Sequence, residues 1–93
     1  MEKLVTILEQ GAHSQRTYDG KDGQPTVFNY MDFILTDGID EFHAQATGNL
    51  AQALKPLDKS VLHHVQCHIS HSTYERKDGT VGHENKIYID RIV

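Results

Sequence analysis

The chain has 93 residues, 38% of them hydrophobic and 24% charged, which is typical of one globular domain with a modest core. Nine Lys and Arg residues against thirteen Asp and Glu give a formal net charge of −4, which argues against a strongly basic protein that coats phosphates indiscriminately. Any contact with nucleic acid must therefore come from a local patch of cations.

Most of the chain is predicted to form strands, because runs rich in β-branched and aromatic residues alternate with Gly, Pro and Asp. In chain order the expected strands are 4–8, a short extended piece at 16–18, 26–36, 39–47, 61–74 and 85–92. Two Asp-Gly pairs and a proline predict a projecting loop over 18–25. Asp37-Gly38 predicts a tight turn, and residues 77–80 predict another.

One short helix is expected among these strands. Residues 48–54 carry apolar side chains at positions 50, 51 and 54, with Asn49 as the expected N-cap and Pro56 as the stop. Five long antiparallel strands would leave unpaired edges that a closed barrel removes, and this order of elements is the one expected of an OB-fold. We therefore predict an all-β fold over a single domain, residues 1–93: a five-stranded OB-fold barrel with one short helix between strands 3 and 4.

Alternation along the long strands separates a core side from an outer side. In the strand 26–36, Met31, Phe33 and Leu35 are expected in the core because Asp32 must point away from it. In the strand 61–74, the expected core residues are Val65, Cys67 and Ile69, with His64, Gln66, His68 and Ser70 on the other side. In the last strand, Ile87, Ile89 and Arg91 oppose Lys86, Tyr88 and Asp90.

The single cysteine and the first apolar run indicate the cellular compartment of the protein. Cys67 cannot form an intramolecular disulfide, which favours a reducing, intracellular setting. The run over 4–8 is interrupted by Thr6 and preceded by two charged residues, so it lacks the length and flanks of a signal peptide or membrane span. We expect a cytoplasmic protein with no membrane partner.

Several short stretches in the second half of the chain are similar to a known family. They are Glu41-Phe42-His43, Gly48-Asn49-Leu50-Ala51, Leu57-Asp58-Lys59-Ser60 and Ile69-Ser70-His71-Ser72-Thr73-Tyr74. Each resembles the corresponding segment of bacterial single-stranded-DNA-binding proteins. The chain has no Trp and no acidic tail, and in lacking the tail it looks more like the primosomal replication protein B group, or like a phage or mobile-element version. The resemblance implies an OB-fold that binds single-stranded DNA in replication, recombination or repair, as a homodimer or homotetramer.

Proteins bind single strands by stacking aromatic rings on bases while cations follow the phosphates. Phe28 and Tyr30 are expected on the outer side of their strand, and Tyr18 and Tyr74 lie where the two loops begin. These four residues, with Phe42, are the stacking candidates. The candidate cations are Arg16, Lys21, Lys55, Lys59, Arg76, Lys77 and Lys86, and the candidate histidines are His64 and His68. Five acidic residues share the loops, so we expect modest affinity with a shallow dependence on salt.

The seven histidines do not predict a metal site or a catalytic centre. His64 and His68 would lie roughly 13 Å apart on one strand, too far to share an ion, and no Cys and His spacing matches a zinc site. The Ser and Thr residues near His68 and His71 are separated from them by the alternation of the strand, and no nucleophile elbow or phosphate loop is present. We expect no metal, no cofactor and no enzymatic activity.

Other functions fit the same expected fold. Phe28, Tyr30 and Phe42 could instead cover the ends of the barrel or a subunit interface. The net negative charge and the absence of Trp fit an OB-fold module that binds proteins and no nucleic acid. A small ligand or an oligosaccharide could occupy the same face. Residue spacing does not separate DNA from RNA as a partner.

Overall fold

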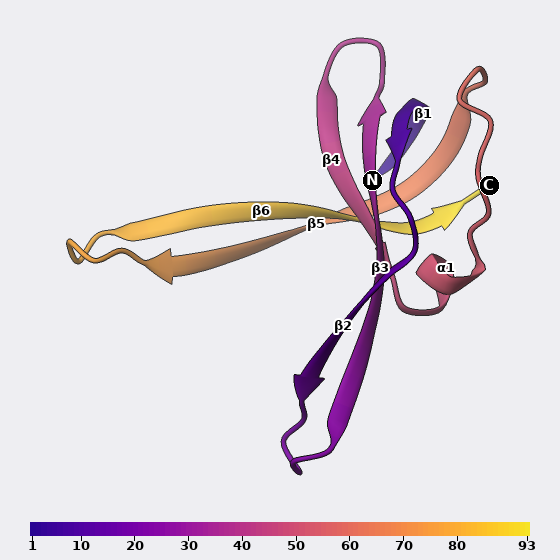
Figure 1. The fold of residues 1–93 in the computed structure, drawn as a ribbon. Helices are drawn as coiled ribbons and strands as arrows, with labels where there is room; N and C mark the ends of the chain where they lie inside the picture. The colour runs from indigo at the N-terminus through magenta and orange to yellow at the C-terminus, as the bar shows by residue number, and fades with distance from the viewer.

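A computed structural model describes all 93 residues and consists mainly of strands (Figure 1). Its elements are β1 (Glu2–Gln10), β2 (Ser14–Asp19), β3 (Pro25–Thr36), β4 (Glu41–Thr47), α1 (Gly48–Ala53), β5 (His63–Glu75) and β6 (Val81–Ile92). The prediction of an all-β fold with one short helix is confirmed. No helix has the length and apolar character needed to cross a membrane.

The strands pair in a ring. They form one sheet in the order β1-β5-β6-β4-β3-β2, and β1 also pairs with β3, so the hydrogen bonding returns to the strand where it began. All pairs are antiparallel except β4 and β6, which meet in parallel at Gln45 and Tyr88. β2 lies outside the ring, beside the N-terminal half of β3. The ring pairs most of the backbone N–H and C=O groups that strand edges in a chain of this length would otherwise expose.

The prediction of five strands is wrong at the N-terminal end, where the structure has two strands. The extended piece at 16–18 belongs to a separate strand, β2, because the chain changes direction at Gly11. The Gly11 N–H donates to the Asp32 carbonyl oxygen at 2.7 Å, and a Cβ at Gly11 would lie only 3.1 Å from that oxygen. Glycine therefore lets the chain pass close to β3, so that β1 pairs with the end of β3 and β2 with its beginning.

The core fills the inside of the ring. It consists of Val5, Ile7, Met31, Phe33, Leu35, Ala44, Ala46, Ala51, Val65, Cys67 and Ile89. The predicted core residues of β3 are confirmed, as are Val65 and Cys67 of β5. Burial raises the pKa of the Cys67 thiol, as expected for an inert side chain in an apolar interior.

The placement of Ile69 in the core is wrong, because this side chain is 56% exposed. β5 and β6 continue past the ring as a long hairpin, and no other element covers that part of it (Figure 1). The last strand also starts earlier than predicted, at Val81, because it pairs with β5 along the whole hairpin. One extra residue, Asp90, lies between Ile89 and Arg91 in the pairing with β5, so the predicted alternation breaks at this bulge.

The helix starts one residue before the predicted N-cap. Thr47, and not Asn49, occupies the N-cap position, and its side chain makes no capping hydrogen bond. Gly48, the first residue of the helix, has a φ of 60°, a conformation that favours glycine. Ala51 is the buried residue of α1 and holds the helix against the core.

The turn between β3 and β4 is closed by Asp37. Its Oδ1 accepts hydrogen bonds from the N–H groups of Asp40 at 2.8 Å and Ile39 at 2.9 Å, and its Oδ2 pairs with Lys3 Nζ at 3.0 Å. The backbone hydrogen bonds, first that from Asp40, hold the pKa of Asp37 well below its usual range. The hydrogen bond to Asp37 raises the pKa of Lys3. The carboxylate therefore joins the turn to β1.

We expect the variant Asp37→Asn to melt a few degrees below the wild type at neutral pH. Because the folded-state pKa is depressed, the stability contributed by Asp37 is fully present above the unfolded pKa of about 3.9 and is lost as the pH falls toward the folded value. The difference in melting temperature should therefore shrink between about pH 5 and about pH 2, as measured by circular dichroism. Asp40→Asn is the matched control, since no hydrogen bond to the Asp40 carboxylate occurs. A difference for Asp37→Asn that does not change with pH would contradict this account.

Candidate functional site

The pairing of the strands gathers aromatic and polar side chains on the outer side of the ring. Residues directly opposite one another in paired strands share a face. Phe28 is opposite Arg16, Gln45 is opposite both Asp32 and Tyr88, and Tyr88 is opposite His68. We call this surface the open face, and its members are Arg16, Tyr18, Phe28, Tyr30, Asp32, His43, Gln45, Thr47, His68, Tyr74, Lys86 and Tyr88.

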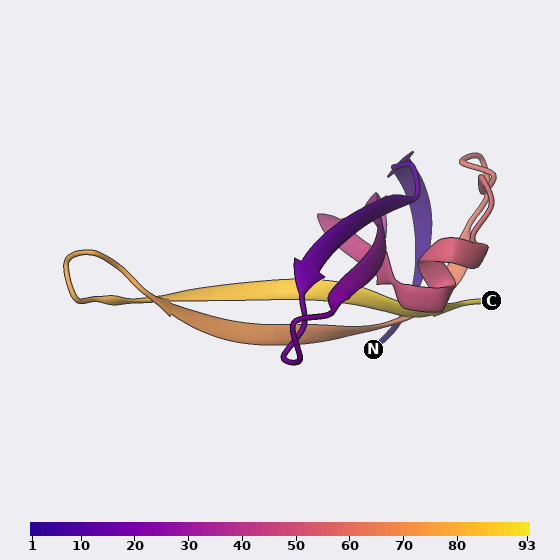
Figure 2. The ribbon, with the colours of Figure 1, turned by 60° about the horizontal axis from the view of Figure 1, so that its bottom comes forward.

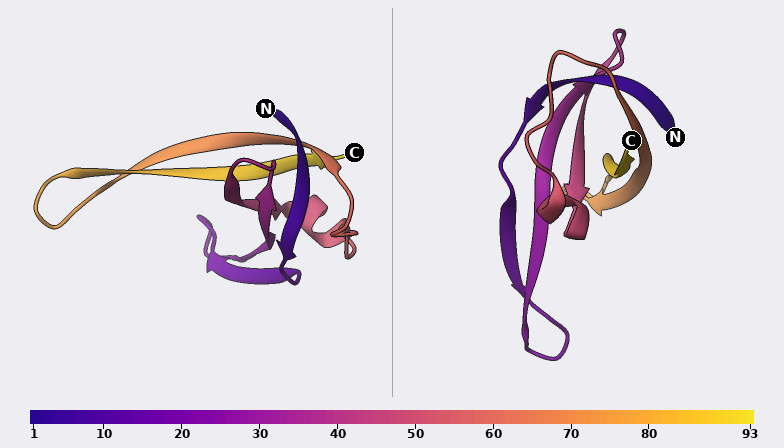
Figure 3. Two further views of the ribbon diagram at one scale, coloured as in Figure 1. Left: turned by 90° about the horizontal axis from the view of Figure 1, so that it is seen from above. Right: turned by 90° about the vertical axis from the view of Figure 1, so that its right-hand side faces the viewer.

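The β2–β3 and β5–β6 hairpins project from the ring in different directions (Figures 2 and 3). Both contribute residues to a cavity of ≈ 390 Å³ on the open face. This larger cavity is lined by Arg16, Phe28, His43, Gln45, Glu84, Asn85, Lys86, Ile87 and Tyr88. A neighbouring cavity of ≈ 310 Å³ is lined by Phe28, Thr47, His68, Tyr88, Ile89 and Asp90. The Phe28 and Tyr88 rings border both cavities.

The aromatic rings of the open face form two stacked pairs. Phe28 and Tyr30 lie with their centroids 5.9 Å apart at 20°, and the Arg16 guanidinium lies 5.5 Å from the Tyr30 centroid. The rings of Tyr88 and His68 lie 5.4 Å apart at 28°. The expectation that Phe28 and Tyr30 point away from the core is confirmed, and both are half-buried. Flat ring surfaces are thus already oriented on this face.

The bulge in β6 orients His68. Asp90, the extra residue of the bulge, accepts hydrogen bonds from His68 Nδ1 at 2.7 and 2.9 Å through its two carboxylate oxygens. A bulge commonly redirects a side chain in this way. The carboxylate fixes the Nδ1–H form of the ring, and His68 Nε2 has no protein partner. His68 can therefore offer Nε2 to a ligand in the smaller cavity.

The cations of the open face form no ion pairs with acidic side chains. Arg16 and Lys86 line the larger cavity, and neither forms an ion pair. Lys21 lies in the turn between β2 and β3. Lys77 lies in the turn between β5 and β6 beside Arg76, whose guanidinium lies 5.6 Å from the Tyr74 centroid. Arg16 and Lys86 are thus the cations that share a cavity with Phe28 and Tyr88, while the turn cations lie at the ends of the two hairpins.

Two of the loop carboxylates have a structural role in the hairpin turns. Asp22 accepts a hydrogen bond from the Gln24 N–H at 3.0 Å. Asp78 accepts from the Thr80 hydroxyl at 2.6 Å and from its N–H at 3.0 Å, and these bonds lower the pKa of Asp78. The acidic residues that weaken the patch therefore also shape the loops that carry its cations.

Tyr74 lies across a glycine on the opposite strand of its hairpin. Gly82 is directly opposite Tyr74, it is buried, and a Cβ at this position would overlap the Tyr74 ring. An aromatic ring that covers a cross-strand glycine stabilises a twisted sheet. This contact explains why half of the Tyr74 side chain is covered although the hairpin is exposed.

Four predicted site residues lie away from the open face. Phe42 is opposite Leu35 and packs against the core. His64 pairs with Glu2 at 3.4 Å, where β1 meets β5. Lys55 and Lys59 follow α1, and Lys59 lines a separate cavity of ≈ 510 Å³.

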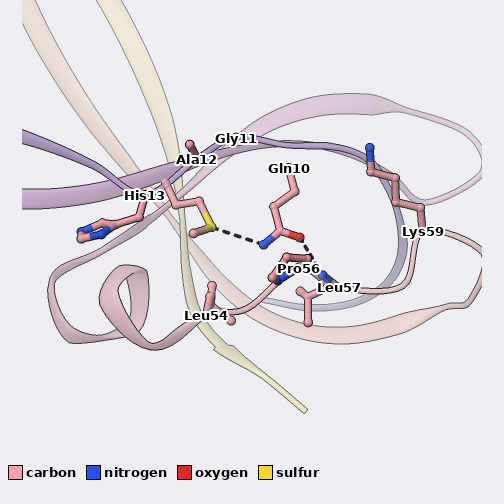
Figure 4. Close-up of a pocket in the computed structure, with 9 residues that line it drawn as sticks. Gln10, Gly11, Ala12, His13, Leu54, Pro56, Leu57 and Lys59 are labelled. Carbon is pink, nitrogen blue, oxygen red and sulfur yellow. Dashed lines mark hydrogen bonds between the residues drawn. The ribbon is translucent and has the colours of Figure 1, made fainter.

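Gln10 holds the segment after α1 at the edge of that separate cavity, as Figure 4 shows. Its Nε2 donates to the Lys55 carbonyl oxygen at 3.0 Å and to Met31 Sδ at 3.4 Å, and its Oε1 accepts from the Leu57 N–H at 2.9 Å. All polar atoms of this side chain are therefore used within the protein. Lys59 has no ion-pair partner.

The sequence-based candidates did not include Tyr88, Gln45 and His43. Tyr88 stands between Ile87 and Ile89, so the alternation that identified Phe28 and Tyr30 also places it outside the core. Gln45 lies between two fully buried alanines and follows the same rule. What alternation could not show is the parallel contact between β4 and β6 that brings Gln45 and Tyr88 together.

Comparisons of the chain with family models and with curated proteins give no match. No group of three or more His, Cys, Asp and Glu side chains is arranged to hold a metal ion. The open face presents flat rings, unpaired cations and hydrogen-bonding groups around two adjoining cavities. This arrangement suits a ligand with planar, partly polar rings on an anionic backbone.

Proposed function

We propose that the chain is an OB-fold that binds single-stranded DNA on the open face. If β1 and β2 are counted as one strand broken at Gly11, the chain has five strands, with α1 between the third and the fourth. OB-folds bind oligonucleotides on the face of their second and third strands, between the loops after the first and fourth strands. Here these elements are β3, β4 and the two projecting hairpins, the same ones that carry the open face.

The observation that carries the proposal is that Phe28 and Tyr88 border both cavities. Two bases of one strand can lie in neighbouring cavities, each against a ring, with Arg16 and Lys86 next to the phosphates. A double helix hides its bases from such rings, so the open face should prefer a single strand.

Fluorescence anisotropy with a labelled 30-nucleotide single strand of mixed sequence tests the proposal. We expect binding that weakens with salt, with a slope of about 0.7 for each phosphate contacted. The few cations on the face predict a shallow slope. The same sequence as a duplex is the control and should bind much more weakly. Absence of binding to the single strand at tens of micromolar protein would overturn the proposed function.

We also propose that the protein acts in replication, recombination or repair as a homodimer or homotetramer. The outer side of β1 supports the assembly, since Leu4 is 58% and Leu8 is 40% exposed. A strand with apolar residues on its outer side is a suitable surface for a second copy. Size-exclusion chromatography with light scattering should give a multiple of the 10.5 kDa chain mass. A monomer mass at all concentrations would contradict the assembly.

A further inference from the structure

Asp32 determines the hydrogen-bonding state of two neighbours on the open face. Its Oδ1 lies 2.8 Å from His43 Nε2 and 3.1 Å from the Nε2 amide of Gln45. An ionised carboxylate can only accept hydrogen bonds, so both neighbours must donate to it. The register supports this arrangement, because Asp32 is directly opposite Gln45 on β4 and His43 is two residues earlier on the same strand.

The atoms that remain on these two side chains are acceptors. A Gln45 amide that donates through Nε2 keeps Oε1 free, and a neutral His43 ring with its proton on Nε2 keeps Nδ1 free as an acceptor. Neither Oε1 nor Nδ1 has a hydrogen-bond partner within the protein. Both side chains line the larger cavity. The β4 wall of this cavity therefore presents acceptors to a ligand.

The other polar groups of the cavity belong to other strands. Arg16 comes from β2, while Glu84, Asn85 and Lys86 come from β6. They comprise two cations, which can only donate, one carboxylate, which can only accept, and one amide, which can do both, as can the Tyr88 hydroxyl. The proposed function places the two cations next to the phosphates. The bias toward a base edge therefore comes from Glu84 and from the wall that Asp32 organises, and both present acceptors.

We propose that the larger cavity selects cytosine and adenine, which carry an amino group at C4 of the pyrimidine or C6 of the purine, over thymine. Cytosine N4 and adenine N6 are donors, whereas thymine has the acceptor O4 at the corresponding position. A donor meets Gln45 Oε1 or His43 Nδ1 as a hydrogen-bond partner, while thymine O4 leaves these acceptors and itself unpaired. This inference rests on the proposed function, because it names the base that the same site prefers.

The test compares 30-nucleotide oligo-dC with oligo-dT, two pyrimidine strands of equal length, by anisotropy at about pH 8, where imidazoles are neutral. We expect oligo-dC to bind about three- to tenfold more tightly, the range for one net hydrogen bond. Gln45→Leu should lose most of this preference, because His43 Nδ1 is then the one acceptor left on the β4 wall. Asp32→Asn should also lose most of the preference, because an amide can donate and leaves Gln45 free to turn.

Gln15→Leu is the matched control. Gln15 lies on β2 opposite Asn29, on the other side of the sheet from Arg16 and Phe28, and its amide donates to Asn29 Oδ1 at 3.0 Å. This variant should keep the wild-type preference. Equal binding of both strands by the wild type, or a preference for oligo-dT, would overturn the inference and leave the proposed function intact. A preference that persists in both Gln45→Leu and Asp32→Asn would also overturn it. Failure to bind either strand would instead overturn the proposed function.

Discussion

Replacing Phe33 by alanine is expected to destabilise the protein by about 3–5 kcal/mol, the range for a fully buried phenylalanine. Phe33 is 1% exposed and is the largest of the fully buried side chains. Domains of this size have a free energy of unfolding of about 5–15 kcal/mol, so the variant should be partly unfolded or unfold at low denaturant. Urea unfolding followed by circular dichroism measures the change.

The size of this effect follows from the neighbours of Phe33. The residue directly opposite it on β4 is Ala44, which is completely buried and too small to fill the space that Phe33 would leave. The core contains no buried polar side chain, so water gains no partner in the resulting cavity. Phe28→Ala is the control, because the same truncation on the half-buried open face should cost less. Equal losses for the two variants would contradict the assignment of Phe33 to the core.

Much of the core could be predicted because alternation is a local property of a strand. Met31, Phe33 and Leu35 share one side of β3 whatever this strand pairs with, and a charged residue such as Asp32 identifies the opposite side. The same reasoning holds for Val65 and Cys67. The turns could be predicted for the same reason, because Asp-Gly pairs specify a local backbone conformation.

The errors occurred where long-range pairing decides the structure. Ile69 belongs to the apolar side of β5, yet it is exposed because the ring ends before it. Nothing local to Gly11 shows that the chain changes partner there, and nothing local to Asp90 indicates a bulge. Each of these features depends on where a strand distant in the sequence begins or ends.

The candidate site was predicted in part for the same reason. Phe28 and Tyr30 followed from alternation, but the choice of cations by their nearness in the sequence also included Lys55 and Lys59, which the structure places beside another cavity. Tyr88 was omitted although it obeys the alternation, because only the contact between β4 and β6 brings it near Phe28. Sequence patterns assign a side chain to a face, whereas the topology decides which faces meet.

Phe28→Ala and Tyr88→Ala are each expected to weaken single-stranded DNA binding by about 1–3 kcal/mol, or about 5- to 150-fold, the effect of removing one stacking ring. Both rings border the two cavities, so each variant removes a wall against which a base can lie. The double variant should lose less than the sum of the two effects, because both rings border both cavities and so share their bound bases. Anisotropy with the mixed 30-nucleotide strand measures all three affinities.

The control for this series is Phe42→Leu, which removes an aromatic ring from the core side of β4. Phe42 lies opposite Leu35 and packs against the core, so this variant should bind DNA as the wild type does while losing some stability. The comparison separates stacking from general weakening of the fold, because both kinds of variant lose one ring. Wild-type affinity in Phe28→Ala and Tyr88→Ala, with folded protein shown by circular dichroism, would mean that bases do not stack on the open face. Binding would then have to come from the cations alone, and the affinity should fall steadily as the salt concentration rises.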